Sequence, residues 1–441
     1  MENRRKEKVP RSQLSNLEAR RPIWDALTPL TQFEEPGRKM SIVSIVRVDD
    51  GRVTEAIQRA IDLVDGLAIL KPGDTVLLKP NLVKPAPAGS GIITDARVTD
   101  AVAKLVLKHQ PGRVIIGEGS SVGYDFPGRV DSLSAMERSG TADVARKYGA
   151  QMVDLNRDEI VDVRAPNAYV METFGVARTA YEADMIINLP VIKTHGRTGI
   201  TCGLKNMKGV LPGNEKKRTH QLGLDRGIVD LNRVIKPHLT VVDALVGRAG
   251  THTQDDDRVR LDCILAGTDV VAVDAVCATI MGFDVDEILH VRLADEAGLG
   301  EADLDCINVY GERIANIARP FQPYAEAAKE RFGEATILEK NTCTGCLGEM
   351  ESTFLYLNEA GLTDRLHELV LIMGTPDEVP DLETTPVIIG RCPSDHRHLG
   401  VWVPGCPPHG IKITDAVCEA LGIDKAQLHR VIKQLHEAGA S

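Results

Sequence analysis

Short apolar runs alternate with amphipathic segments along most of the chain. The runs predict strands at residues 41–48, 75–82, 113–120, 151–155, 185–193, 239–245 and 262–267. Between the first two, Ile57, Ile61 and Val64 recur at the spacing of one helix face. This alternation predicts an α/β fold whose larger domain has a mostly parallel sheet flanked by helices.

A second, smaller set of runs lies near the C-terminus, at residues 369–374, 386–392 and 401–406. A helix is expected before it, with Met350 and Phe354 on its buried face, and another from the prolines after residue 406. We therefore expect a tail or arm at 1–40, an α/β domain at 41–320 and a small C-terminal α/β module at 335–441.

Composition narrows the function classes. The 441 residues carry a net charge of −11, which argues against a nucleic-acid-binding surface. No apolar run reaches the length of a membrane span, and the charged N-terminus does not resemble a secretory signal. A cytoplasmic location is expected, and the oligomeric state stays open.

Polar residues cluster where the predicted strands end. Lys79 and Asn81 follow one strand, Glu118 another, and Lys193 and His195 a third. Ligands of open α/β sheets bind outside the carboxyl ends of the strands. For any single residue, a helix cap or a solvated loop position is the simpler interpretation, and it is the recurrence that suggests a site.

A basic, glycine-rich segment covers residues 188–220 of this acidic chain. It includes Lys193, His195, Arg197, Lys205, Asn206, Lys208, Lys216, Lys217, Arg218 and His220. A local cationic pocket suits an anionic small molecule, either a carboxylate or a phosphate. The alternative is a flexible basic loop.

Several motifs resemble the family called domain of unknown function 362, whose members are often joined to iron–sulfur modules. They are KPNLV (79–83), IGEGS (116–120), NLPVIKTH (188–195), GLKNMKGVLPG (203–213), VVDAL (241–245) and AGTDVVAVDAV (266–276). The resemblance covers about residues 41–315 and implies a polar signature. We take Lys193, His195 and Lys205 as catalytic candidates. The substrate-binding candidates are Lys79, Asn81, Glu118, Asn206, His220, Asp243 and Asp274.

Five of the nine cysteines lie in the last hundred residues. Cys343 and Cys346 have the spacing of two ligands of one centre, while Cys392 and Cys406 each follow a predicted strand. If those strands are parallel neighbours, the two cysteines emerge side by side. Cys418 is expected in a helix core.

The turn around Cys406, VPGCPPHG, resembles the cluster-ligand turn in the small subunits of nickel–iron hydrogenases and of respiratory complex I. One 4Fe-4S cluster is therefore predicted, with zinc as the alternative. Mixed ligation through His396, His398 or His409 stays open.

The leading hypothesis is an iron–sulfur redox protein that passes electrons to or from an anionic small-molecule site or a partner protein. One alternative is a non-redox enzyme on an anionic small molecule, with a structural or Lewis-acid cluster and Lys193 or His195 as acid or base. The other is an electron-donor or assembly factor for another metalloenzyme.

Overall fold

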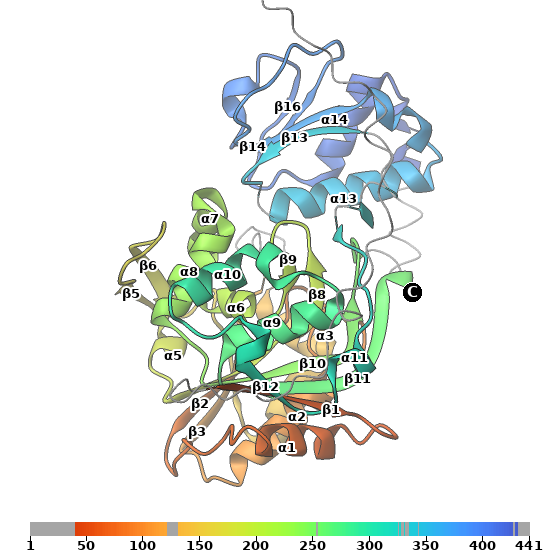
Figure 1. The fold of residues 1–441 in the computed structure, drawn as a ribbon. Coiled ribbons are helices and arrows are strands. Elements are labelled where there is room, and N and C mark those ends of the chain that lie inside the picture. Colours follow the sequence, from red (N-terminus) through yellow and green to blue (C-terminus); the bar gives the residue numbers. More distant parts are fainter. Residues whose placement is uncertain are drawn as a thin grey trace, which may run out of the picture.

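A computed structural model describes residues 40–430, apart from 121–130, 253–254, 325, 328–329, 331–334, 343 and 427. It contains a large mixed sheet and a small parallel sheet, each with its own helices (Figure 1). The predicted α/β class is confirmed. Within the described residues, no helix is long and apolar enough to cross a membrane.

The large sheet is mostly parallel. Its strands lie in the order β12 (Ile307–Gly311), β1 (Ser41–Arg47), β11 (Arg258–Gly267), β10 (Leu239–Arg248), β7 (Met185–Leu189), β2 (Thr75–Pro80), β3 (Arg113–Glu118) and β4 (Gln151–Asp154). β8 (Val191–His195) pairs with β10, and β9 (Gly199–Thr201) folds back on β8. β11 runs antiparallel to both of its neighbours.

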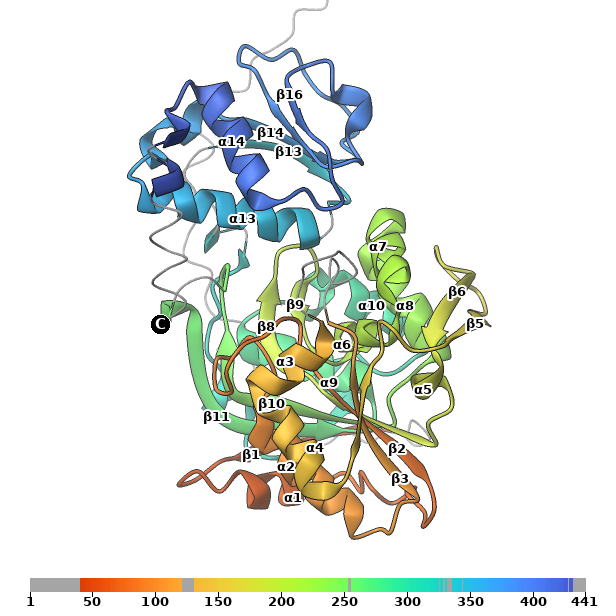
Figure 2. The same cartoon turned by 180° about the vertical axis from the view of Figure 1, so that it is seen from behind.

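Helices cover both faces of this sheet, because successive side chains along its buried strands pack alternately into two separate cores. In β11, Leu265 packs in one core, whereas Ile264 and Ala266 pack in the other. The first face carries α6 (Gly203–Asn206), α8 (Leu224–Val234), α9 (Val270–Met281) and α10 (Leu289–Glu296). The second face, seen in Figure 2, carries α1 (Val53–Asp62), α2 (Ala96–Leu107) and α4 (Thr141–Tyr148).

Smaller elements complete this part of the molecule. They are the antiparallel pair β5 (Ile160–Arg164) and β6 (Thr173–Ala177), and the helices α3 (Ser132–Ser139), α5 (Arg178–Tyr181), α7 (Gly213–Leu222) and α11 (Ile314–Ile317).

The C-terminal sheet is wholly parallel. Its order is β13 (Thr336–Lys340), β14 (Val370–Gly374), β15 (Val387–Ile389) and β16 (Val401–Val403). The helices α13 (Thr344–Glu359) and α14 (Gly410–Leu421) pack on it. Met350, Phe354 and Cys418 are buried in its core, as predicted.

Some elements differ from the sequence prediction. The run 185–193 forms two strands, since Pro190 separates β7 from β8. α14 begins at Gly410, after the prolines, with His409 as its N-cap. The strands β5, β6, β12 and β13 lack long apolar runs and were not predicted. The domain boundaries stay a prediction.

Candidate functional site

A buried ion pair joins the ends of β2 and β3. Lys79 Nζ donates to both carboxylate oxygens of Glu118, at 2.9 and 3.0 Å, and neither side chain is exposed by more than 3%. The carboxylate also accepts the backbone N–H groups of Leu82 and Gly119. A Cβ atom at Gly209 would overlap Glu118 and Lys79, so the pair also explains a glycine of the GLKNMKGVLPG motif.

A chain of amides links the neighbouring strand ends. Asn81 Nδ2 donates to Asn206 Oδ1 at 2.8 Å, and Asn206 Nδ2 donates to Asn188 Oδ1 at 2.8 Å. Asn188 Nδ2 then donates to the carbonyl of Gly203, at the start of α6. These contacts bring together two predicted residues, Asn81 and Asn206, that lie on different elements. Asn188 was not predicted, although it lies in the NLPVIKTH motif.

Lys193 joins the free end of this amide chain. Its Nζ donates to Asn81 Oδ1 at 2.8 Å and to the Ile92 carbonyl at 2.6 Å, both neutral acceptors. Burial lowers the pKa of Lys193 well below its usual value, and the neighbouring positive charges of Lys205 and Lys84 lower it further. Both effects favour the neutral amine of Lys193 over its ammonium form.

Two predicted carboxylates hold backbone rather than facing open space. Asp274 accepts the N–H groups of Gly203 and Leu204 at 2.6 and 3.0 Å and so fixes the start of α6. Asp243 accepts the N–H groups of Asp95 and Leu245 and ties the start of α2 to β10. Burial raises the pKa of Asp243 to about 7 and that of Asp274 to about 6.

His195 lies at the end of β8, held by its own turn. Its Nδ1 accepts the backbone N–H of Arg197 at 3.1 Å and is 3.1 Å from Thr198 Oγ1. Burial lowers the pKa of His195 well below its usual value, and Lys205 adds to the effect. The ring is therefore neutral, and because Nδ1 accepts, its proton is on Nε2.

The other predicted cations gather beside His195. Lys208 Nζ lies 2.9 Å from His220 Nε2, and His220 Nδ1 finds no hydrogen-bond partner within the described residues. Burial and the charges of Lys208 and Lys205 lower the pKa of His220. Burial lowers the pKa of Lys205 to about 8. These groups form the cationic cluster, defined as Lys193, His195, Lys205, Lys208 and His220.

One member of this neighbourhood was missed by sequence reasoning. His252 Nε2 lies 3.0 Å from Thr194 Oγ1, which donates to the Gly250 carbonyl. Burial lowers the pKa of His252, and Lys193 is the next largest cause. The sequence offered only a histidine in a short polar segment between the VVDAL and AGTDVVAVDAV motifs, and outside both of them.

The cysteines of the C-terminal sheet do converge. β15 and β16 are parallel neighbours in which Ile389 pairs with Val403, so Cys392 and Cys406 each lie three residues beyond one paired position. Cys346 lies in the first turn of α13. All three line one hollow, whereas Cys343 lies outside the described residues. The predicted side-by-side emergence of Cys392 and Cys406 is therefore present.

The cysteine hollow is closed by the large α/β part. Lys217 and Gln221, one turn apart on α7, line it together with the cysteines. On the same helix, Lys216 and His220 are buried. Arg197 adds a second link, since it donates to the Thr342 carbonyl at 2.7 Å and to Glu339 at 2.9 Å. α7 therefore contributes residues to both the cysteine hollow and the cationic cluster.

The three histidines proposed as alternative ligands do not line the hollow. His409 caps α14, and His398 Nδ1 lies 3.0 Å from the Asp395 carbonyl. His396 lies in a short helical turn between β15 and β16.

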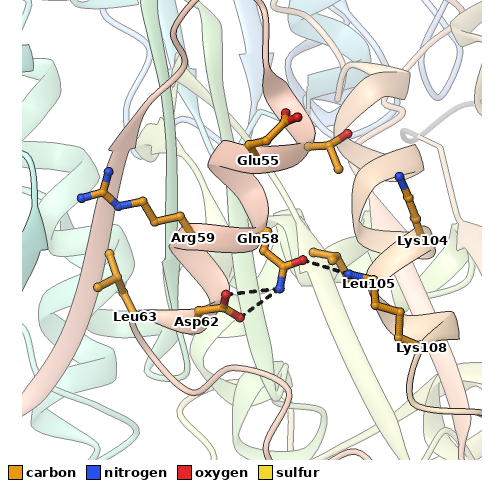
Figure 3. A pocket seen from close by; sticks show the side chains of 9 residues that line it. Glu55, Gln58, Arg59, Asp62, Leu63, Lys104, Leu105 and Lys108 are labelled. Atoms are coloured by element: carbon orange, nitrogen blue, oxygen red, sulfur yellow. Dashed lines mark hydrogen bonds between the residues drawn. The ribbon is translucent and has the colours of Figure 1, made fainter.

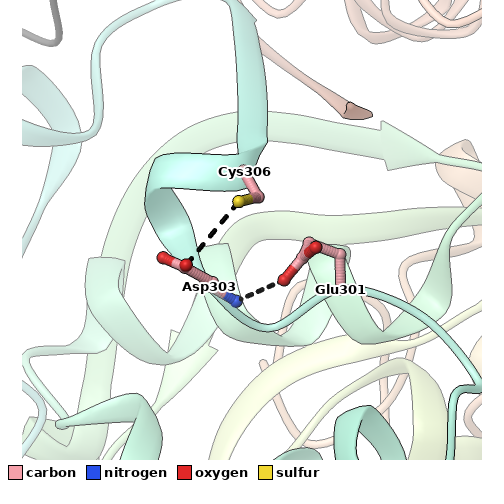
Figure 4. A group of neighbouring side chains, drawn as sticks. All are labelled: Glu301, Asp303 and Cys306. Atoms are coloured by element: carbon pink, nitrogen blue, oxygen red, sulfur yellow. Dashed lines mark hydrogen bonds between the residues drawn. The ribbon is translucent and has the colours of Figure 1, made fainter. Parts of the chain in front are cut away.

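The remaining cysteines lie elsewhere. Cys202, Cys263 and Cys277 are buried in the main core. Cys306 lies near Glu301 and Asp303, with all three ligand atoms within 4.8 Å of one another (Figure 4). Cys306 Sγ donates to Asp303 at 3.6 Å, and Glu301 accepts the Asp303 N–H, so internal hydrogen bonds account for this grouping.

A surface pocket between α1 and α2 has different chemistry. Gln58 donates to Asp62 and accepts from Lys108, so part of the polar lining of this pocket is paired with itself (Figure 3). None of the predicted site residues lines it.

Comparisons agree with the motif resemblance over part of the chain. Residues 76–279 match the family described as Domain of unknown function (DUF362), which confirms the resemblance for that segment. A thylakoid-associated protein of Synechocystis sp. is 25% identical over 269 residues, covering 59% of this chain and 80% of that protein. The cysteine module lies beyond the matched family segment.

Among solved structures, the lactate racemase apoprotein from Thermoanaerobacterium thermosaccharolyticum is similar at 14% identity and a TM-score of 0.35. The match covers 57% of this chain and 60% of that one. A similarity of this level carries no conclusion about activity. The cytoplasmic location also stays a prediction.

Proposed function

We propose that this protein is an iron–sulfur redox protein, with one 4Fe-4S cluster held by Cys343, Cys346, Cys392 and Cys406. The observation that carries the proposal is the convergence of Cys346, Cys392 and Cys406 on one hollow, to which α7 of the cationic cluster also contributes residues. When bound, such a cluster supplies one-electron transfer. An anionic small molecule at the cationic cluster is the proposed redox partner of this centre, with a docked protein as the alternative.

The donor set favours a cluster over zinc. Thiolates around tetrahedral zinc lie about 3.8 Å apart, from a Zn–S distance of about 2.3 Å. Among the described residues, the sulfurs of Cys346, Cys392 and Cys406 do not all lie within 4.8 Å of one another. Wider spacing suits ligands that bind different irons. Thr342 Oγ1, which also lines the hollow, is buried and finds no partner in the described part of the chain, so it is available to donate to a sulfur.

The cationic cluster supplies the anion site. Lys205 and Lys208 provide positive charge, while His195 Nε2–H and His220 Nδ1–H, which has no partner among the described residues, provide neutral donors. Carboxylates and phosphates accept such hydrogen bonds strongly. Each histidine has its other ring nitrogen held by the protein, so the donors are oriented before a ligand arrives.

Metal analysis of the full chain, purified without oxygen, tests the cluster. We expect about four irons per chain and little zinc. Stoichiometric zinc without iron would refute the cluster assignment.

Thermal melts with inorganic phosphate and with small carboxylates test the anion site separately. A bound anion should raise the melting temperature by mass action. Lys205→Met should remove this response, whereas the control Lys104→Met, on the exposed surface of α2, should keep it. An equal response in the two variants would show that the cationic cluster is not the binding site.

The placement of Lys193 favours a second candidate, a non-redox enzyme that uses this neutral amine as a general base on the same anion. A redox titration followed by electron paramagnetic resonance separates the two. A reversible one-electron step supports the redox protein. A centre that stays in one oxidation state in the presence of dithionite supports the second candidate.

A further inference from the structure

Lys193 and Lys79 are both buried at the carboxyl edge of the large sheet, yet their surroundings differ. Lys79 is paired with the Glu118 carboxylate. Among the described residues, Lys193 Nζ contacts only the Asn81 side chain and the Ile92 carbonyl, and no carboxylate lies within ion-pair distance of it. The sheet edge therefore holds one lysine paired with a carboxylate and one with neutral partners.

The hydrogen-bond count at Lys193 matches an uncharged amine. A neutral amine has two hydrogens and one lone pair, whereas an ammonium has three hydrogens and no lone pair. The two acceptors, at 2.8 and 2.6 Å, take both hydrogens of the neutral form. An ammonium would bury a third hydrogen without an acceptor, beside the positive charges of Lys205 and Lys84.

A lysine whose pKa is lowered by burial and by nearby cations is more nucleophilic at neutral pH than an exposed lysine. The same cations attract an anionic ligand to the position where that amine lies. A carbonyl group on the ligand would then meet a lone pair rather than an ammonium.

We propose that Lys193 forms an imine with a small carbonyl compound that carries an anionic group, such as a 2-oxo acid or a phosphorylated aldehyde. Lys193 Nζ attacks the carbonyl carbon, a C–N bond forms, and the carbonyl oxygen leaves as water with two protons. If the imine then takes up a proton, it carries one N–H, which Asn81 Oδ1 or the Ile92 carbonyl accepts. This inference rests on the proposed anion site and is independent of the metal centre.

Reductive trapping tests the imine. The full chain is incubated with glyoxylate, or with pyridoxal 5′-phosphate as an anionic aldehyde, and treated with sodium borohydride, which reduces an imine to a stable secondary amine. Peptide mass spectrometry then locates the label. We expect saturable labelling at Lys193 and none at Lys79, which is the internal control because it is fully buried and paired with the Glu118 carboxylate.

A variant that keeps the lysine separates reactivity from folding. Asn81→Asp places a carboxylate 2.8 Å from Nζ, where it stabilises the ammonium form. Labelling at pH 7.5 should fall by about tenfold for each unit by which the lysine pKa rises above that pH. Asn188→Asp is the matched control, since its side chain contacts Asn206 and not Lys193. Melting curves confirm that both variants are folded.

Labelling confined to exposed lysines of the folded wild type would overturn the inference, as would equal labelling of Lys193 in the two variants. If anions stabilise the protein but no imine is trapped, the anion site is supported and the imine proposal is refuted. If neither is observed, the anion site of the proposed function falls as well.

Discussion

Separating the buried ion pair of Lys79 and Glu118 should cost more stability than any exposed pair in the molecule. The Glu118 carboxylate accepts from Lys79 and from two backbone N–H groups. Glu118→Gln keeps one acceptor oxygen, so one backbone N–H faces an amide NH₂ and Lys79 loses its counter-charge. Lys79→Met leaves a buried carboxylate without its cation. Removing one partner of a buried pair typically costs about 3–5 kcal/mol.

Urea unfolding followed by circular dichroism measures the effect. With a slope of about 3 kcal/mol per molar urea, each single variant should shift the midpoint by about 1 M or more. The double variant Lys79→Met with Glu118→Gln should lose less than the sum of the two, since no unpaired charge remains. Glu172→Gln, which breaks the exposed Arg164–Glu172 pair, is the control and should change the midpoint little.

The result that would refute this reasoning is a pair of single variants that unfold at the midpoint of the control. Additive losses in the double variant would also contradict it, because they would mean that the two side chains contribute independently. Either outcome would mean that the ion pair contributes little to stability, although its side chains still leave no room for a Cβ atom at Gly209.

Three further predictions concern the cysteine ligands, Gly209 and Asp243. Cys392→Ser should lose bound iron in anaerobically purified protein, whereas Cys418→Ser, in the core of α14, should retain it; the reverse pattern in a metal analysis would contradict the ligand assignment. Gly209→Ala should destabilise the fold by about 1–3 kcal/mol, because its Cβ overlaps Glu118. An unchanged midpoint in urea unfolding would contradict this expectation. The pKa of Asp243 in the folded protein, about 7, lies above its unfolded value of about 4. The contribution of Asp243 to stability should therefore be lost as pH rises from about 4 through about 7. Asp243→Asn should reduce the decline in the free energy of unfolding between pH 5 and pH 8. If the decline is unchanged in this variant, other groups cause it.

The sequence by itself determined the α/β class and much of the site composition. Strand and helix periodicity is local, so the alternation of short apolar runs and amphipathic segments was sufficient for the fold class. The ends of buried parallel strands meet at one edge, so the placement of Lys79, Glu118 and Lys193 near one another also followed. The positions of Cys392 and Cys406 after two short strands followed from the same rule.

Only the tertiary structure decided which groups are partners. Lys79 contacts Glu118, 39 residues away, whereas Lys193 contacts Asn81, 112 residues away. Charge alone would have allowed either lysine to take the carboxylate. The order of β2, β3 and β8 in the sheet settles that choice, and strand order depends on long-range packing that no local pattern encodes.

The same limit applies to roles that depend on backbone position. Asp243 and Asp274 accept backbone N–H groups from distant segments, which a count of carboxylates at strand ends does not distinguish from ligand contacts. α7 contributes His220 to the cationic cluster and Lys217 and Gln221 to the cysteine hollow, and this arrangement depends on how the C-terminal part packs beside the helix. A side chain acquires its chemistry from the groups packed around it, and in this protein those groups come from segments far apart in the chain.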